Sequence, residues 1–130
     1  MSKDPRSILV VDDNEDIRNL LSLVLQKEGY EVFLAPNGSE ALEIIKNNRL
    51  DLILLDVMMP ELSGLEVLSN IRGNKNNIIS SIPVMMITAA STVSDIDAAI
   101  EIGASSYIIK PFRNENLIGK VSAIFQEELA

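Results

Sequence analysis

In the stretch SILVVDDNED, residues 7–16, an apolar run ends abruptly in a cluster of acids. Residues 7–11 have the length and the Ile/Val content of a strand that is buried on both faces. Asp12 and Asp13 follow this strand directly, and further acids come close behind. Since like charges repel, their massing at the end of a core strand needs a physical explanation.

Composition narrows the classes of protein to which the chain can belong. Its 130 residues, of which 47% are apolar, predict one domain spanning residues 1–130. The formal net charge of −8 argues against direct contact with nucleic acid. The absence of cysteine and histidine excludes thiol chemistry, the usual transition-metal ligands and a phosphohistidine within the chain.

The chain shows no sign of export or of a membrane span. The opening MSKDPRS lacks an apolar stretch of signal-peptide length, and no later run approaches the length of a membrane helix. We therefore expect a soluble, cytoplasmic protein that makes no membrane contact.

Strand-like and helix-like segments alternate along the sequence. Further apolar runs like the first one occupy residues 31–35, 51–56, 83–88 and 106–110. Apolar residues recur at helical spacing in segments 15–28, 39–48, 64–72 and 93–102, and again at Leu117, Val121, Ile124 and Phe125. The first helix is expected to turn its apolar stripe inward at Ile17, Leu20, Leu21, Val24 and Leu25. Helix C-caps are expected at Gly29 and Gly103, and the longest loop at 72–81.

Five βα units in succession predict an α/β fold, a doubly wound parallel sheet with helices on both faces. For five strands the flavodoxin-like order 2-1-3-4-5 is favoured, and ligands bind at the carboxyl ends of the strands where the order reverses. Asp12 and Asp13 end the first strand, Asp56 the third, Thr88 the fourth and Lys110 the fifth. This topology brings three carboxylates, one hydroxyl and one amine to one rim of the sheet.

Three carboxylates on one rim cannot all stay ionised without a compensating charge. Two of them about 4 Å apart repel by roughly 4 kcal/mol at an effective dielectric constant near 20. Lys110 supplies one positive charge, and a divalent cation can supply the rest. Because all the available ligands are oxygens, the sequence predicts Mg²⁺ or a similar hard ion, with Mn²⁺ as the alternative.

The remaining acids near these strands are interpreted as structural. Glu15 and Asp16 fall in the first turn of the first helix, where the helix dipole favours negative charge. Asp51 opens the third strand at the opposite end of the sheet and is expected to be a solvated surface acid.

Four motifs along the chain resemble the receiver domains of two-component response regulators: ILVVDDNED, LILLDVMMPELSG, PVMMITA and GASSYIIKPF. The resemblance covers nearly the whole chain, with a core from about residue 7 to residue 125. It implies a signalling phosphoacceptor and not an enzyme, with self-catalysed phosphoryl transfer and slow autodephosphorylation as its only chemistry. The donor would be a phosphohistidine on a histidine kinase or a histidine phosphotransfer protein. The output would pass to a downstream protein target or an output domain.

The resemblance also implies how the rim would bind the phosphoryl group and the metal. Asp56 would be the phosphoacceptor. The metal ligands would be Asp13, Asp56 and the backbone carbonyl of Met58, with Asp12 assisting through water. Lys110 would contact both the phosphoryl group and the acceptor carboxylate.

A switch is implied at the neighbouring strand ends. Thr88 would move toward the phosphoryl group, and Tyr107 would rotate into the space it leaves; a half-buried strand residue is the alternative reading of Tyr107. The Lys110–Pro111 peptide bond would be cis. The movement would remodel the face built from the fourth helix, the fifth strand and the fifth helix, and a phosphorylation-dependent homodimer through this face is left open.

Two variable positions of receivers bear on how long the phosphoryl group lasts. They lie two residues after Asp56 and two residues after Thr88, and here they hold Met58 and Ala90. Neither side chain can orient an attacking water, so slow self-dephosphorylation is expected. Gly64, in the loop after the third strand, is expected to permit the backbone geometry of that loop.

Particular residues argue against several other functions. An EF-hand is mimicked by Asp12, Asn14 and Asp16, but its glycine and its closing glutamate are missing. A haloacid-dehalogenase-type phosphatase needs a second aspartate two residues after its nucleophile, which neither acid site provides. A flavodoxin-like cofactor binder needs a phosphate loop where this chain has DDNED, which would repel phosphate. The alternative that stays open is a receiver-like interaction module that is never phosphorylated, although such proteins usually lack one of the acids or the lysine.

The sequence names neither the kinase nor the signal or the target, and it leaves the oligomeric state open. The chain is either a free-standing regulator or a receiver taken from a longer regulator or hybrid kinase. The opening MSKDPRS resembles a native N-terminus, which argues against an internal fragment.

Overall fold

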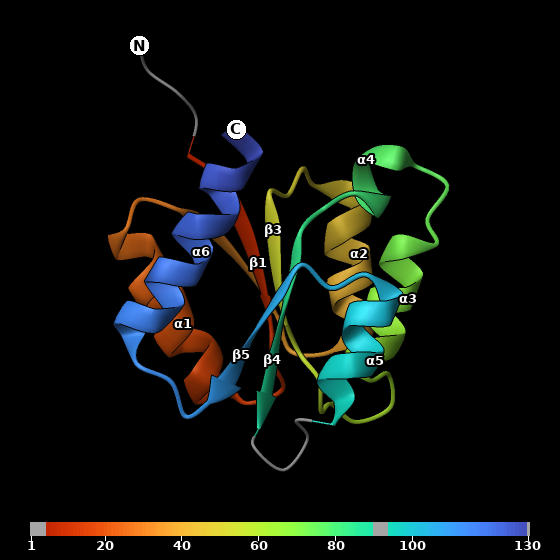
Figure 1. Cartoon of the computed structure of the whole chain (residues 1–130), viewed down its shortest axis with the longest axis horizontal. Helices are drawn as coiled ribbons and strands as arrows, with labels where there is room; N and C mark the ends of the chain where they lie inside the picture. Colours follow the sequence, from red (N-terminus) through yellow and green to blue (C-terminus); the bar gives the residue numbers. More distant parts are fainter. Residues whose placement is uncertain (1–4, 90–93, 130) are drawn as a thin grey trace.

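The computed structural model describes residues 5–89 and 94–129. One parallel sheet lies between two layers of helices (Figure 1). Its strands are β1 (Ser7–Val11), β2 (Glu31–Ala35), β3 (Leu52–Asp56), β4 (Val84–Ala89) and β5 (Ser106–Lys110), in the order β2-β1-β3-β4-β5. The predicted doubly wound α/β fold and its strand order are confirmed.

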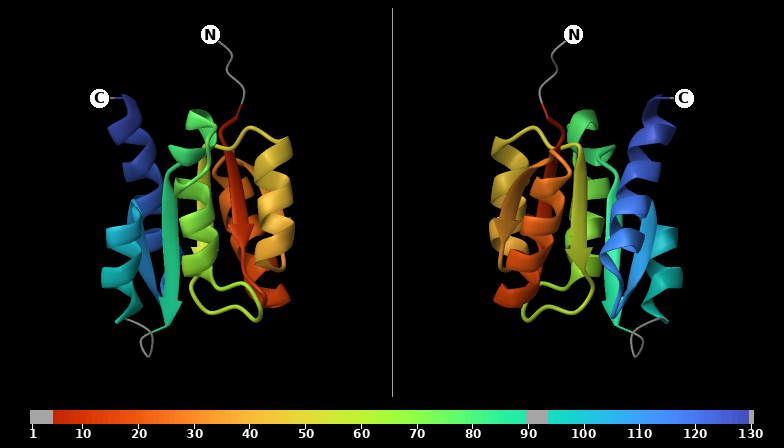
Figure 2. Two further views of the ribbon diagram at one scale, coloured as in Figure 1. Left: turned by 90° about the vertical axis from the view of Figure 1, so that its right-hand side faces the viewer. Right: turned by 90° about the vertical axis from the view of Figure 1, so that its left-hand side faces the viewer.

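Helices cover both faces of the sheet. They are α1 (Glu15–Lys27), α2 (Gly38–Asn47), α3 (Gly64–Arg72), α4 (Asn77–Ser80), α5 (Asp95–Ile102) and α6 (Asn114–Leu129). Helices α1 and α6 lie on one face, and α2, α3 and α5 lie on the other (Figures 1 and 2). The fourth and fifth helices expected from the sequence are thus α5 and α6. Residue 93, where the fourth was expected to begin, is outside the described residues.

The predicted long loop 72–81 was wrong in one respect, because it contains the single turn α4. The Asn76 side chain accepts a hydrogen bond from the Ile78 amide at 2.9 Å and so caps this turn. One helical turn is too short to show an apolar period, which explains why the sequence pattern missed it.

Each face of the sheet buries its own apolar core. Along β1, Ile8 packs toward α1 and α6, whereas Leu9 packs toward α2 and α3. Every residue of β1 and β3 is buried. The edge strands β2 and β5 are only partly buried, so the prediction that they are covered on both faces was wrong. An edge strand has a neighbouring strand on one side only, and the helices leave its outer side open.

The helix signals in the sequence were mostly correct. Gly29 and Gly103 have φ angles of 92° and 125° and follow or cap the ends of α1 and α5, as expected of C-cap glycines. The buried stripe of α1 is narrower than predicted, because Leu20 is 50% exposed whereas Leu21 is buried. No helix within the described ranges is long and apolar enough to cross a membrane.

Arg72, the last residue of α3, ties three segments together with its half-buried guanidinium. Its Nε donates to the Gly103 carbonyl at 2.9 Å, and its Nη1 donates to the carbonyls of Ser80 and Ile82 at 3.1 and 2.7 Å. Burial lowers the pKa of the Arg72 guanidinium. These bonds fix the end of α5 and the approach to β4 against the end of α3.

Replacing Arg72 by methionine is expected to lower the free energy of unfolding by about 2 kcal/mol, because it leaves partly buried carbonyls without their donor. Urea unfolding of the variant measures the loss. Arg49→Met, at an exposed arginine, serves as the control and should change stability by less than about 0.5 kcal/mol. Equal stability of the two variants would contradict this role of Arg72.

Candidate functional site

The carboxyl ends of the strands form one rim, at the lower edge of the sheet in Figure 1. Asp12 and Asp13 directly follow β1, and Asp56 is the last residue of β3, the strand beside it. Each of these acids offers a carboxylate oxygen that lies within 4.8 Å of those of the other two. The rim therefore assembles the three carboxylates that the strand order predicted.

Asp12 is fully buried, and both of its carboxylate oxygens are engaged. Oδ1 accepts a hydrogen bond from the Asn14 amide at 2.9 Å, and Oδ2 lies 3.2 Å from Lys110 Nζ. Its main-chain carbonyl accepts a hydrogen bond from Arg18 Nη1 at 2.7 Å. Asp12 is thus held rigidly, whereas Asp13 beside it is exposed to solvent.

Lys110 joins the two buried acids from the far edge of the sheet. It ends β5, and its Nζ lies 3.6 Å from Asp56 Oδ2 as well as 3.2 Å from Asp12 Oδ2. The peptide bond between Lys110 and Pro111 is cis. One ammonium group therefore faces two carboxylates, which leaves the rim negatively charged when all its acids are ionised.

The negative charge of the rim contributes to a raised pKa of Asp56. Burial, followed by the charge of Asp12, raises the pKa of Asp56 to about 6. Lys110 and the Met58 amide, which donates to Asp56 Oδ1 at 3.2 Å, lower the pKa, and Asp13 adds a smaller increase. At neutral pH without a cation, an ionised Asp56 is consequently under electrostatic strain.

The other predicted site residues follow or belong to β3, β4 and β5 and differ in how much they are exposed to solvent. Thr88 is fully buried in β4 and donates a hydrogen bond from Oγ1 to the Ala89 carbonyl at 3.2 Å. Met58 follows β3, and its side chain is 61% exposed. Tyr107 lies in β5 and is 37% exposed, at the outer edge of the sheet. Ala90 is outside the described residues.

The first turn of α1 contains Glu15 and Asp16, where the sequence placed them. The sequence analysis missed the cap of this helix: the Asn14 side chain accepts a hydrogen bond from the Ile17 amide at 3.1 Å. An asparagine just before the first helical residue is a recognisable signal for such a cap. It also missed Arg18, whose contact with Asp12 has no comparable signal because it depends on the folded chain.

Gly64 has a different purpose from the one expected. The left-handed residue of its loop is Glu61, with φ 66°, and Gly64 itself has no positive φ. A Cβ at Gly64 would collide with the Asp56 carbonyl oxygen and would lie 2.9 Å from Val57 Cα. Glycine is therefore required by the close approach of α3 to the end of β3, and not by backbone conformation.

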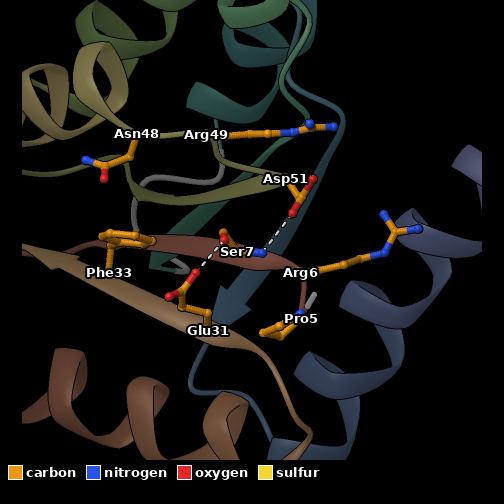
Figure 3. A pocket seen from close by; sticks show the side chains of 8 residues that line it. All are labelled: Pro5, Arg6, Ser7, Glu31, Phe33, Asn48, Arg49 and Asp51. Carbon is orange, nitrogen blue, oxygen red and sulfur yellow. Dashed lines mark hydrogen bonds between the residues drawn. The ribbon is translucent and has the colours of Figure 1, made fainter. Parts of the chain in front are cut away.

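The opposite end of the sheet holds a cavity of about 610 Å³ (Figure 3). Asp51 lies in its wall at the predicted end of the sheet, but it is half-buried and its Oδ2 accepts a hydrogen bond from the Ser7 amide at 2.8 Å, so the expectation of a solvated surface acid was only partly right. Glu31 accepts from the Ser7 hydroxyl at 2.9 Å, and Arg6 stacks on the Phe125 ring at 4.4 Å. These contacts link the start of β1 to β2, to the residue before β3 and to α6.

Only the acidic rim has a donor set that suits a metal ion among the described residues. Asp12, Asp13 and Asp56 each offer a carboxylate oxygen there. Hard divalent cations such as Mg²⁺ and Mn²⁺ prefer such ligands, and a cation there would offset the negative charge that raises the pKa of Asp56.

Comparison with known proteins agrees with this geometry. The sequence profile of the response regulator receiver domain matches residues 8–122. The chain is 42% identical over 122 residues to the response regulator MprA of Mycobacterium sp. (strain KMS). This alignment covers 94% of this chain and 51% of MprA. It is 40% identical over 120 residues to the transcriptional regulatory protein YkoG of Bacillus subtilis (strain 168), covering 92% and 51%.

A solved structure shows the same likeness in three dimensions. The Vibrio cholerae chemotaxis protein CheY4 superimposes with a TM-score of 0.85 at 32% identity, covering 92% of this chain and 98% of that one. The chain spans about half the length of MprA and YkoG and nearly the full length of CheY4.

Proposed function

Since the chain belongs to the response regulator receiver domain family, we propose that Asp56 accepts a phosphoryl group from a phosphohistidine of a partner protein. The observation that carries this proposal is the rim itself, in which a nearly buried carboxylate lies 3.6 Å from an ammonium group and beside two further acids. The chain contains no histidine, so the donor must be another protein, either a histidine kinase or a histidine phosphotransfer protein.

In the proposed step, a carboxylate oxygen of Asp56 attacks phosphorus. The phosphorus–nitrogen bond of the donor breaks, and its electron pair stays on the imidazole, which then takes up a proton. The new bond makes Asp56 an acyl phosphate. Phosphoryl transfer depends mainly on positioning and on neutralising charge, and both are provided here: the Met58 amide orients Asp56 Oδ1, and Lys110 Nζ lies beside Oδ2.

The same residues would hold a hard divalent cation. Asp13 and Asp56, together with the Met58 backbone carbonyl, would be its ligands, and Asp12 would act through water because its own oxygens are already engaged. When bound, Mg²⁺ supplies positive charge that lets a carboxylate and a phosphoryl group approach each other. Lys110 alone leaves the rim short of positive charge, which is why we propose a metal as well.

Phosphorylation adds negative charge and new acceptor oxygens at this rim, and Thr88 carries a hydroxyl near the end of β4, the strand beside β3. We propose that Thr88 turns toward the phosphoryl group, that Tyr107 moves into the space it leaves, and that the face formed by α5, β5 and α6 changes shape. A partner protein or an output domain would read this face, as would a second phosphorylated copy in a homodimer. YkoG is named a transcriptional regulatory protein, and this chain matches about half of its length. That name is the ground for proposing a DNA-binding output domain as one possible partner of the face.

The experiment that tests the proposal is incubation with acetyl phosphate and Mg²⁺, read by intact mass. The wild type is expected to gain one phosphoryl group, and Asp56→Asn is expected to gain none, because the nucleophilic oxygen is lost. Asp51→Asn, at the opposite end of the sheet, should be modified like the wild type. EDTA should abolish the modification. A wild type that binds Mg²⁺ and still gains nothing would favour a receiver-like scaffold that acts unmodified.

The proposed domain should also lose its phosphoryl group slowly. The Met58 side chain is exposed beside Asp56 and cannot orient a water, so Met58→Asn is expected to shorten the phosphoryl lifetime several-fold. The decay of the phosphorylated mass after removal of acetyl phosphate measures it, with Met58→Leu as the apolar control. Ala90→Glu should act in the same direction. Lifetimes unchanged by both polar substitutions would contradict the expectation.

A further inference from the structure

Tyr107 lies against a positive charge on the outside of the sheet. Lys120 of α6 makes a cation–π contact with the Tyr107 ring, and its Nζ lies 5.2 Å from the ring centroid. Both residues line a cavity of about 570 Å³ between β5 and α6, together with Ile109, Pro111 and Asn116. The described salt bridges are those of Lys110, and Lys120 takes part in none of them. Among the described residues, the contact that the structure shows for the Lys120 ammonium group is therefore the one with the Tyr107 ring.

Lys120 and the Tyr107 side chain belong to opposite faces of the sheet. Tyr107 is paired with Met86 of β4, and Met86 packs into the core under α2, α3 and α5. Paired residues of neighbouring strands direct their side chains to the same face, so Tyr107 starts on the α5 side, as Thr88 does two residues beyond Met86. Helix α6 packs on the opposite face through Leu117 and Val121.

To meet Lys120, the Tyr107 ring must turn around the open edge of the sheet. It can do so because β5 is an edge strand, between α5 and α6 in Figure 1. Tyr107 as a whole residue is 37% exposed there. An inward rotation toward Thr88 would separate the ring from Lys120, so the cation–π contact exists in one orientation and is lost in the other.

We propose that Lys120 is a positioning residue that latches Tyr107 outward and so opposes the switch. The inference rests on the proposed function, because it assumes that phosphorylation favours the inward ring. A cation–π contact at an exposed site shifts such an equilibrium by about two- to fivefold. Because a ligand's apparent affinity scales with the fraction of protein in the state that binds it, the latch should weaken phosphoryl-analogue binding by the same factor.

Titration with beryllofluoride in the presence of Mg²⁺ tests the latch on the full chain. Lys120→Met is expected to bind the analogue about two- to fivefold more tightly than the wild type. Loss of a positive charge from an acidic protein would by itself weaken binding of an anionic ligand, so the two explanations predict opposite signs. Lys120→Arg should keep wild-type affinity, because guanidinium groups also stack on aromatic rings.

Two further variants complete the design. In a Tyr107→Leu background, Lys120→Met should change the affinity no further, because the partner of the latch is gone. Lys75→Met, in the turn before α4, removes an exposed lysine elsewhere and should leave the affinity unchanged. Weaker or equal binding by Lys120→Met, or the same gain in the Tyr107→Leu background, would overturn the proposal.

A measurement without any ligand separates this inference from the proposed function. Tyr30 and Tyr107 are the only tyrosines, so incorporation of 3-fluorotyrosine gives two fluorine resonances, and Tyr107→Leu identifies one of them. Lys120→Met is expected to move the Tyr107 resonance and leave that of Tyr30 in place. An unmoved Tyr107 resonance would overturn the latch even if Asp56 is phosphorylated. A moved resonance in a protein that binds no beryllofluoride would support the contact and contradict the proposed function.

Discussion

Gly64→Ala is expected to lower the free energy of unfolding by about 3 kcal/mol, the largest loss of stability that we predict for a single methyl group in this chain. The added Cβ would collide with the carbonyl oxygen of Asp56 and would lie 2.9 Å from both the Asp56 carbonyl carbon and Val57 Cα. These are backbone atoms, so no side chain can turn aside to relieve the overlap. The Gly64 amide also donates to the Val57 carbonyl at 3.0 Å, which fixes the two segments at this separation.

Urea unfolding of Gly64→Ala, followed by circular dichroism, measures this loss. Gly119→Ala is the matched control, because a Cβ there meets nothing within 4 Å and α6 gains a better helix former. It should raise stability by about 0.5–1 kcal/mol. Since the collision involves the main chain of the acceptor residue, Gly64→Ala should also slow modification by acetyl phosphate in whatever fraction remains folded. A Gly64→Ala variant as stable as the wild type would contradict the close approach of α3 to β3.

Asp56→Asn is expected to stabilise the metal-free protein, although it destroys the proposed function. The pKa of Asp56 is raised from 3.8 to about 6 in the folded state, so between these values the folded chain binds more protons than the unfolded chain. Stability therefore falls as pH rises from about 4 to about 6, and the whole penalty is present above that window. A shift of about two pKa units corresponds to about 3 kcal/mol, of which the neutral amide should recover about 1–3 kcal/mol.

Urea unfolding in EDTA across pH 4 to pH 8 tests the sign of this effect. The advantage of Asp56→Asn over the wild type should be small near pH 4, grow to about pH 6 and stay constant at higher pH. Adding Mg²⁺ should stabilise the wild type more than the variant, because a cation that binds the folded state shifts the equilibrium by mass action. Asp51→Asn is the control and should lose stability, since the Ser7 amide would donate to a neutral amide oxygen in place of a carboxylate. An Asp56→Asn variant that is less stable than the wild type at pH 8 would show that Lys110 outweighs burial at this position.

The fold class and most of the rim could be predicted from local sequence patterns. Uninterrupted apolar runs that lead to Asp12, Asp56 and Lys110 predict strands. They can do so because the pattern of a strand depends only on residues that are neighbours in the sequence. Right-handed crossovers then fix which ends meet, so three acids and a lysine could be placed together before any coordinates were known. The same local signals located the C-cap glycines of α1 and α5.

Features that depend on contacts between distant segments could not be predicted in this way and became visible in the folded chain. The role of Gly64 depends on where α3 approaches β3, and no local pattern distinguishes this from a conformational requirement. Asp51 and Arg72 found partners far away in the sequence, at Ser7 and Gly103, so their burial could not be foreseen from their polar character. The contact between Tyr107 of β5 and Lys120 of α6 likewise joins two elements that the sequence gives no reason to pair at these residues. In each case the interaction energy depends on distances that exist only once the layers of the fold have packed.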